Sequence, residues 1–297
     1  MSRILVTGGT GFVGAALVPE LVKAEHQIQL LVRPGTTRPI PCANQVQVSI
    51  ADVFDEQGVA QAMQGNEVVI HLAATGFGPR LSVEQPLESA RVNLWGTLNL
   101  LEAARRAGVK KFLFSSTYMV YGCGETILKP ESPVRPFTPY ALQKYQAELA
   151  VRQYAELYGM NALIFRLANV YGPKIRADLG WRPVIAIFQE KVQRGEPITI
   201  EGAGLQARDF IHVQDVVSGL MAGLAYDKPA LGEVFNLASG QSTSMIELAR
   251  LFGGPVTHLP ARSQDMANAT IDISKTQDFL GWEPKISIEA GIKELMS

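Results

Sequence analysis

The chain has 297 residues, and its 27 lysines and arginines nearly balance its 28 aspartates and glutamates. The length indicates one large or two modest domains, and the near-neutral charge argues against a broad basic surface for nucleic acid or an anionic membrane. Two cysteines are too few for a disulfide framework or a zinc site, and no apolar run is long enough for a signal peptide or a membrane span, so we expect a cytoplasmic protein without a metal.

Short β-branched segments alternate with helix-length amphipathic segments through the first half of the chain. The predicted strands cover residues 4–7, 28–32, 46–50, 68–72, 112–115 and 163–167. The predicted helices between them cover residues 11–24, 55–63, 92–107 and 140–157. Apolar strands separated by helices indicate a doubly wound parallel α/β sheet with helices on both faces.

A glycine-rich loop joins the first predicted strand to the first predicted helix. Its glycines satisfy both Gly8-x-x-Gly11-x-x-Gly14 and Gly9-x-Gly11-x-x-Gly14. Glycines here allow a tight turn and a close approach of the backbone to a pyrophosphate at the helix N-terminus, as in a Rossmann-type sheet. The sequence therefore predicts dinucleotide binding. The loop residues expected at the cofactor are Gly8, Gly11, Phe12, Val13 and Gly14.

The ends of the second and third strands bear on the choice of cofactor. A site that prefers NAD usually has an acid at the end of the second strand, where this chain has Arg33. A guanidinium suits a 2′-phosphate and favours NADP, although Arg33 stacked on adenine or pointing to solvent is the open alternative. Asp52, after the third strand, is a candidate acceptor for the adenine amine, and its neighbour Val53 is expected in the same site.

Three residues in the middle of the chain form a candidate catalytic set. Tyr140 and Lys144 are four residues apart and face the same side of a helix. An adjacent ammonium and a positively charged nicotinamide ring lower the pKa of a tyrosine, which then accepts a proton from a sugar hydroxyl. Thr117, at the tip of the fifth strand, offers a hydroxyl that orients the substrate oxygen. Tyr/Lys pairs four residues apart are common on helices. The prediction therefore depends on the order along the chain, in which the glycine loop comes first, the strand tip with Thr117 second and the Tyr/Lys pair third.

The second half of the chain breaks the alternating pattern. A stretch punctuated by glycine and proline follows residue 169, and a last strand is expected at residues 234–238. We expect a dinucleotide-binding domain made of residues 1–169 and about 212–242. A smaller mixed α/β substrate domain then comprises residues 170–211 and 243–297.

Further motifs span almost the whole length and carry a family resemblance. They are His71-Leu72-Ala73-Ala74, Asn93-x-x-Gly96-Thr97, Thr117-x-x-Val120-Tyr121-Gly122, Arg166-x-x-Asn169-x-Tyr171-Gly172-Pro173, Arg208-Asp209-Phe210-Ile211-His212-Val213, Asp272-x-Ser274-Lys275 and Leu280-Gly281-Trp282-x-Pro284. With them the chain resembles the extended short-chain dehydrogenases/reductases of the nucleotide-sugar epimerase/dehydratase type, in particular the UDP-glucose/UDP-galactose 4-epimerases. The resemblance implies further cofactor contacts at Leu72, Ala73, Ala74, Asn93, Ser115, Tyr140 and Lys144.

The resemblance also implies how a nucleotide sugar is held. Asn169, Arg208 and Arg262 match the residues that bind the diphosphate, and a nearly neutral protein needs such local guanidiniums for a dianion. Asp265 matches a residue that contacts the nucleoside. Ala269 matches the position that limits the C2 substituent, where a small side chain leaves room for an N-acetyl group. Trp181 and Arg182 lie near where relatives contact the sugar, and their roles stay open.

The two residues after Thr117 argue against two of the family's reactions, dehydration and decarboxylation. Dehydratases and decarboxylases of the family carry an acid there, whereas this chain has Tyr118 and Met119, which cannot shuttle that proton. The favoured interpretation is a 4-epimerase, in which hydride leaves C4, a 4-keto sugar forms, and hydride returns to the opposite face. The alternative is an NADPH-dependent 4-ketoreductase of a nucleotide-linked deoxyhexose, which Arg33 favours. A remote third possibility is a dinucleotide-sensing protein without catalysis.

The helices at residues 92–107 and 140–158 are apolar on more than one face. One face packs on the sheet, so the other needs a second cover. We expect a homodimer through these helices, as in related two-fold dimers, with a loop of the same chain as the alternative.

Overall fold

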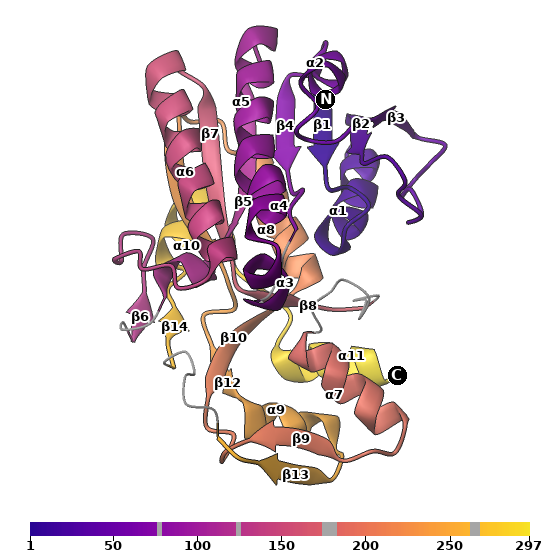
Figure 1. Cartoon of the computed structure of the whole chain (residues 1–297), viewed down its shortest axis with the longest axis vertical. Coiled ribbons are helices and arrows are strands. Elements are labelled where there is room, and N and C mark those ends of the chain that lie inside the picture. The colour runs from indigo at the N-terminus through magenta and orange to yellow at the C-terminus, as the bar shows by residue number, and fades with distance from the viewer. Residues whose placement is uncertain (76–78, 123–125, 174–182, 262–267) are drawn as a thin grey trace.

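Seven strands form one parallel sheet, in the order β11-β7-β5-β4-β1-β2-β3 (Figure 1). They are β1 (Arg3–Thr7), β2 (Gln27–Val32), β3 (Val46–Ile50), β4 (Val68–His71), β5 (Lys111–Thr117), β7 (Asn161–Leu167) and β11 (Leu231–Leu237). The computed structural model describes residues 1–75, 79–122, 126–173, 183–261 and 268–297. The prediction of a Rossmann-type doubly wound parallel sheet is confirmed.

Helices cover both faces of the sheet because successive residues of a strand point to opposite faces. In β1, Ile4 and Val6 share a core with α1 (Phe12–Lys23) and α8 (Val213–Ala225). Leu5, between them, belongs to the core on the other face. The helices of that second face are α2 (Glu56–Met63), α5 (Gly96–Ala107) and α6 (Pro139–Tyr158).

Strand β3 is the least buried strand of the parallel sheet. It lies at the edge of the sheet and pairs only with β2. Val48 and Ile50 are exposed, Ile50 to 72%. The terminal strand of the sheet is thus more exposed than the inner strands β4 and β5.

The predicted helix over residues 92–107 is divided in two. Its first turn is a π-helical segment, η1 (Arg91–Trp95), and α5 begins only at Gly96. Two short helices, α3 (Pro79–Glu84) and α4 (Pro86–Ala90), precede it. A Cβ on Gly96 would lie 2.4 Å from Cγ2 of Val53, so glycine lets the start of α5 pack against the segment after β3. Wider π-turns of this kind are common near functional sites.

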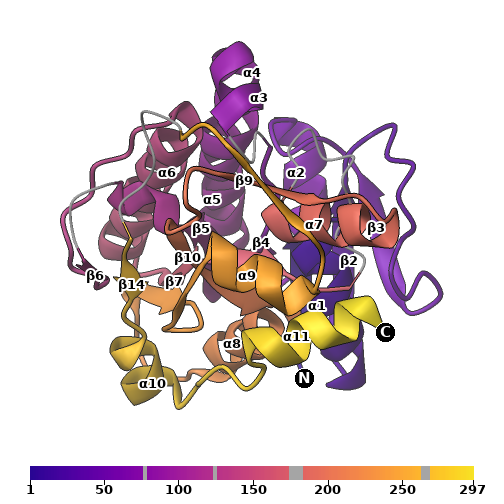
Figure 2. The same cartoon turned by 90° about the horizontal axis from the view of Figure 1, so that it is seen from below.

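A smaller part of the molecule lies beyond the end of β7 (Figures 1 and 2). Its paired strands are β8 (Asn169–Tyr171), β10 (Ala207–His212) and β12 (Ser242–Ser244) in one sheet, and β9 (Ile198–Glu201) and β13 (Val256–Leu259) in another. Strands β8, β9, β10 and β13 share a separate core with α7 (Val184–Gln193), α9 (Met245–Phe252) and α11 (Ile288–Met296).

The C-terminal segment does not follow the expected division of domains. Strand β14 (Thr270–Ile271) pairs with β6 (Ile127–Leu128), and α10 (Ser274–Leu280) follows it. Ile271 and Trp282 are buried in the core of the large sheet, and the indole nitrogen of Trp282 donates a 2.8 Å hydrogen bond to Ser218 Oγ of α8. Residues 270–282 therefore pack with the large sheet, although the sequence assigned them to the smaller domain.

Within the described residues, no helix combines the length and apolar character needed to span a membrane.

Candidate active site

The glycine loop follows β1, the strand at which the strand order of the sheet reverses. β2 and β3 extend the sheet on one side of β1, and β4 continues it on the other. Gly8 has a φ of +71°, and a Cβ there would lie 2.6 Å from the backbone nitrogen of Ala73. A Cβ on Gly14 would lie 2.2 Å from the carbonyl oxygen of Gly8. Glycine is needed at position 8, where two loops meet, and at position 14, where α1 meets the loop before it. Such a switch point is where ligands bind in doubly wound sheets.

The N-terminus of α1 is suited to an anion. Its N-cap is Gly11, which provides no side-chain hydrogen bond to the first turn, and that turn contains no acid. Phe12 and Val13 open the helix and are half-buried. The first backbone N–H groups of a helix lack partners within it and carry a partial positive charge, so a phosphate is favoured here.

A buried histidine next to this loop connects β4 to β1 and α5. His71 Nδ1 lies 2.7 Å from Thr7 Oγ1, and its Nε2 lies 2.9 Å from Thr97 Oγ1. Thr97 donates its hydroxyl proton to the carbonyl oxygen of Asn93, so it accepts from Nε2–H, and Nδ1 accepts from Thr7. This pattern requires a neutral imidazole, and burial, reinforced by the charge of Lys144, holds the pKa of His71 well below its usual value.

Asn93 shapes the loop that follows β4. Its Oδ1 accepts a 2.9 Å hydrogen bond from the backbone N–H of Thr75, and its Nδ2 donates to Thr75 O and to Gln143 Oε1. The buried amide thus joins α6 to the loop. The predicted cofactor residues Leu72, Ala73 and Ala74 lie in that loop and are half-buried.

Arg33 and Asp52 lie close enough to interact at the far end of the predicted cofactor site. Arg33 is exposed at the end of β2, and Asp52 is half-buried after β3. Burial raises the pKa of Asp52, while backbone hydrogen bonds and the positive charge of Arg33 oppose that shift. Val53 beside them is buried under Gly96.

The predicted catalytic residues are all buried. Thr117, Tyr140 and Lys144 are 7%, 4% and 1% exposed. Thr117 ends β5, and its Oγ1 accepts a 3.2 Å hydrogen bond from the backbone of Met119, at the start of η2 (Tyr118–Tyr121). Tyr140 enters the first turn of α6 because Thr138 caps that helix through a 3.1 Å hydrogen bond from the backbone of Ala141.

Lys144 is a buried amine with an unusual environment. Its Nζ has no hydrogen-bond partner among the described residues and lies 4.1 Å above the ring centre of Phe114. Burial lowers the pKa of Lys144 to about 7, although the charge of Glu148 acts to raise it. Burial also raises the pKa of Tyr140, so the phenol needs a nearby positive charge before it can act as a base.

Two buried acids were missed by the sequence analysis. Glu148 is 1% exposed and continues the four-residue interval of Tyr140 and Lys144, a spacing that could have revealed it. Asp209 follows Arg208 directly and accepts hydrogen bonds from the backbone N–H and the hydroxyl of Ser239, each 2.8 Å long. Burial raises the pKa of Asp209 to about 6, against these hydrogen bonds.

Two of the predicted substrate residues line one small cavity. Its walls are formed by Tyr118, Gly122, Leu128, Ala207, Arg208, Asp209, Ala269 and Ile271. Asn169 lies next to it, where its Oδ1 accepts a 3.2 Å hydrogen bond from the Tyr118 hydroxyl and its Nδ2 donates to the carbonyl oxygen of Asp209. The structure thus brings Arg208, Ala269 and Asn169 to one region.

Four residues singled out in the sequence, Trp181, Arg182, Arg262 and Asp265, lie outside the described residues.

Comparisons with known proteins identify the family of the chain. Residues 4–238 match the model of the NAD dependent epimerase/dehydratase family. The chain is 34% identical to a UDP-glucose 4-epimerase of Mycolicibacterium smegmatis over 98% of this chain and 96% of that protein. The crystal structure of a Thermotoga maritima UDP-glucose 4-epimerase with UDP-glucose superposes with a TM-score of 0.91, at 32% identity over 99% of this chain and 97% of that one. A Thermus thermophilus UDP-glucose 4-epimerase in complex with NAD gives a TM-score of 0.86, at 29% identity over 99% and 98% of the two chains.

Proposed function

Because the chain belongs to the NAD-dependent epimerase/dehydratase family of enzymes, we propose that it is a nucleotide-sugar 4-epimerase that keeps its nicotinamide cofactor between turnovers. The family name covers eliminations as well as epimerisations, so the reaction must be argued from the site. The observation that carries the proposal is the residue after Thr117. Where an elimination needs an acid, Tyr118 directs its hydroxyl to Asn169.

The residues present fit a dinucleotide. The contact between Gly8 and Ala73 leaves no room for a side chain, the N-cap residue of α1 makes no side-chain hydrogen bond to the first turn, and the buried Nζ of Lys144 has no partner among the described residues. A pyrophosphate on the helix and a ribose hydroxyl on the lysine would satisfy these groups. The Thermus thermophilus relative, whose structure contains NAD, supports the same cofactor here.

The chemistry assigned to the chain's own residues is proton transfer. When bound, the nicotinamide ring supplies the acceptor and donor for the hydride of C4. Tyr140 accepts the proton of the C4 hydroxyl and later returns it, Lys144 holds the phenolate form by its charge, and Thr117 orients the C4 oxygen. All three side chains are buried, and we propose that a bound sugar shields them and the 4-keto group from water between the two steps.

Substrate recognition is assigned to the cavity beside this triad. Arg208 offers a forked set of donors to the diphosphate, and Arg262 and Asp265 are proposed to complete the nucleotide site. A 4-keto sugar must present both faces in turn, so it has to rotate about a firmly held diphosphate. Ala269 lines the cavity, and because its side chain is small, UDP-hexoses and UDP-N-acetylhexosamines are both proposed as substrates.

One observation favours a second candidate, an NADPH-dependent 4-ketoreductase. Arg33 is exposed at the end of β2 beside Asp52, where a 2′-phosphate could be bound. A non-catalytic dinucleotide sensor is disfavoured, because the chain keeps both Tyr140 and Lys144. Mass spectrometry of the nucleotide released from freshly purified, denatured protein separates the two enzymes. Stoichiometric NAD supports the epimerase, whereas an empty site that takes up NADPH favours the reductase.

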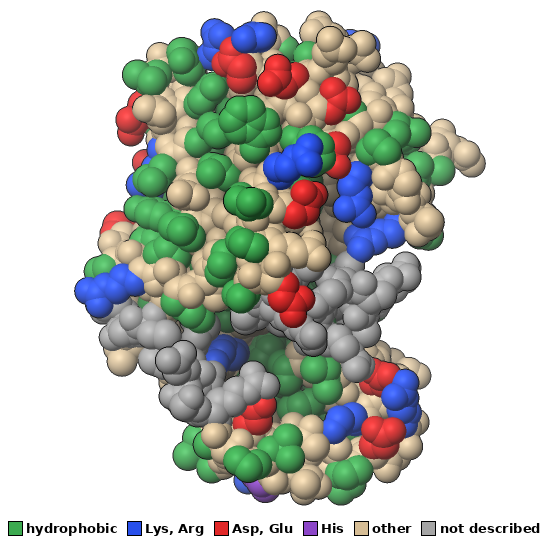
Figure 3. Space-filling model, in the orientation of Figure 1, with side chains coloured by type: hydrophobic (Ala, Val, Ile, Leu, Met, Phe, Trp, Pro, Cys, Tyr) green, Lys and Arg blue, Asp and Glu red, His purple; other side chains and the backbone are tan. Residues whose placement is uncertain are grey.

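A homodimer is proposed on the face formed by α5 and α6. Hydrophobic side chains gather over these two helices on the molecular surface (Figure 3). Trp95, Leu142, Leu149 and Leu157 are exposed there, between 45% and 66%. A second copy related by a two-fold axis would cover the same face on both subunits.

A further inference from the structure

A row of three ionisable residues follows one side of α6. Tyr140, Lys144 and Glu148 occur at four-residue intervals, and all are at most 4% exposed. A carboxylate buried this deeply requires compensation. Glu148 obtains it from Arg166 of β7, whose Nε and Nη2 donate hydrogen bonds of 3.0 and 2.7 Å, and from the hydroxyl of Ser116 in β5.

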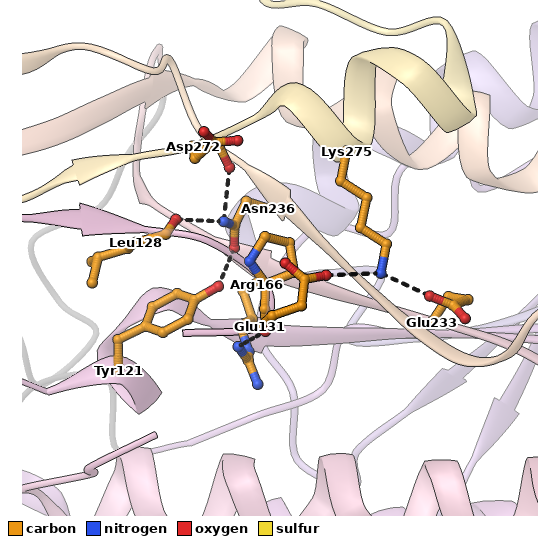
Figure 4. Close-up of polar contacts among 9 residues, drawn as sticks. Tyr121, Leu128, Glu131, Arg166, Glu233, Asn236, Asp272 and Lys275 are labelled. Atoms are coloured by element: carbon orange, nitrogen blue, oxygen red, sulfur yellow. Dashed lines mark hydrogen bonds and ion pairs between the residues drawn. The ribbon is translucent and has the colours of Figure 1, made fainter. Parts of the chain in front are cut away.

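Arg166 is held in place by further contacts besides its pairing with Glu148. Its Nη1 donates a 3.1 Å hydrogen bond to the carbonyl oxygen of Pro130, and its guanidinium lies 4.6 Å from the ring centre of Tyr121. Tyr121 in turn donates a 2.6 Å hydrogen bond to Asn236, which donates to the carbonyl oxygens of Leu128 and Asp272 (Figure 4). The guanidinium therefore has a fixed place, and so does the carboxylate bound to it.

Lys275 secures the same segment from its outer side. Its Nζ lies 2.8 Å from a carboxylate oxygen of Glu233 and 3.3 Å from one of Glu131, the residue after Pro130 (Figure 4). The C-terminal motif Asp272-x-Ser274-Lys275 thus supports the loop that positions Arg166. The motif therefore has a structural role that the sequence alone did not indicate.

The titratable and aromatic groups around Lys144 come from three elements. Glu148 and Tyr140 lie on α6 itself, the ring of Phe114 lies on β5, and His71 lies on β4 and is neutral. Glu148 is the acid whose charge raises the pKa of Lys144 in the described part of the chain. Arg166, which is paired with this carboxylate, offsets part of its charge, and the remaining effect of Glu148 is to raise the pKa of Lys144.

We propose that Glu148 is a positioning residue, whose carboxylate shifts the shared proton of the Tyr140–Lys144 pair toward the lysine. The inference rests on the proposed function, in which Tyr140 is the base. After one proton is lost, the pair is either phenolate with ammonium or phenol with neutral amine. Both forms hold the same number of protons, so pH cannot choose between them, and the local charge decides. Glu148 favours the form that contains the reactive phenolate.

The test is the titration of Lys144 in the cofactor-free protein. Lysine labelled with ¹³C at Cε is followed by NMR across pH, and the Lys144 signal is assigned by its loss in Lys144→Met. The wild-type midpoint is expected at about 7. The decisive variant is Glu148→Gln with Arg166→Met, because it removes both charges and leaves no unpaired guanidinium. Its midpoint is expected to fall by about one unit.

Controls separate the electrostatic role from a structural one. Glu156→Gln removes an exposed carboxylate from the same helix and is expected to leave the midpoint unchanged. If the double variant does not fold, Glu148→Asp, which keeps the charge, must titrate closer to the wild type than Glu148→Gln. A double variant that titrates at the wild-type midpoint, or Asp and Gln variants that titrate alike, overturns the proposal.

Activity gives a second and independent readout. In the double variant, kcat is expected to fall about tenfold with KM unchanged, the change that one pKa unit corresponds to. The acidic limb of the pH profile is expected to move to lower pH, because the first proton then leaves the lysine more easily. The NMR titration needs neither cofactor nor sugar, so a chain without epimerase activity would contradict the proposed function and leave the role of Glu148 to be decided by the titration.

Discussion

Gly8 and Ala73 are in contact at the end of β1, the strand at which the strand order reverses. A Cβ on Gly8 would lie 2.6 Å from the Ala73 backbone nitrogen. The contact joins the loop after β1 to the loop after β4. Since both loops border the proposed cofactor site, the shape of that site depends on a position where no side chain fits.

Gly8→Ala is therefore expected to damage both folding and cofactor binding. Its positive φ alone costs an L-residue about 1–3 kcal/mol, and the clash with backbone adds to it. Gly35→Ala is the matched control, because Gly35 has a φ of +73° with no atom within 4 Å of the added Cβ. Chemical denaturation and NAD titration of both variants measure the difference. Equal losses in the two would show that the contact with Ala73 is unimportant.

Tyr140→Phe is expected to remove catalysis while keeping the fold, since the buried ring stays and only the hydroxyl is lost. Loss of a general base lowers kcat by about 10²- to 10⁴-fold. NAD binding, measured by calorimetry, is expected to persist. Tyr145→Phe changes a half-buried tyrosine on the same helix and should leave kcat near wild type. Full activity in Tyr140→Phe would refute the catalytic assignment.

Arg208→Ala is expected to weaken the binding of the nucleotide sugar more than it slows the reaction. Losing a charge-assisted hydrogen bond to the diphosphate costs about 1.5–3 kcal/mol, which raises KM roughly 10- to 100-fold. Arg250→Ala, at an exposed position on α9, provides the control. Steady-state kinetics measure KM and kcat for both variants. An unchanged KM in Arg208→Ala would show that Arg208 does not bind the substrate.

Leu142→Glu combined with Leu149→Glu is expected to give a monomer. Both leucines are exposed, 45% and 46%, on the face of α6 proposed as the dimer interface, and two like charges there would oppose each other across a two-fold axis. Light scattering coupled to gel filtration measures the mass. Leu259→Glu, at 45% exposure on β13, is a matched control that should remain dimeric. A wild-type protein that is already monomeric would contradict the interface.

Much of the fold was accessible from the sequence because its signals are local. A strand such as Ile4–Thr7 followed by glycines is visible in consecutive residues, and Tyr140 and Lys144 are brought together by helical spacing alone. The pairing of Glu148 with Arg166 was not accessible, because it depends on which strand lies beneath α6. The two-residue strands β6 and β14 are too short for any periodicity, and they pair across more than a hundred residues. The placement of residues 270–282 against the large sheet was missed for the same reason.

The most direct test of the central claim uses UDP-glucose that carries deuterium at C4. The protein, as purified and without added cofactor, is incubated with this sugar, and the products are followed by NMR and mass spectrometry. The account predicts UDP-galactose that retains the deuterium at C4, because the hydrogen removed from one face returns to the other. Failure to form the 4-epimer, or consumption of one NADPH for each sugar converted, would contradict it.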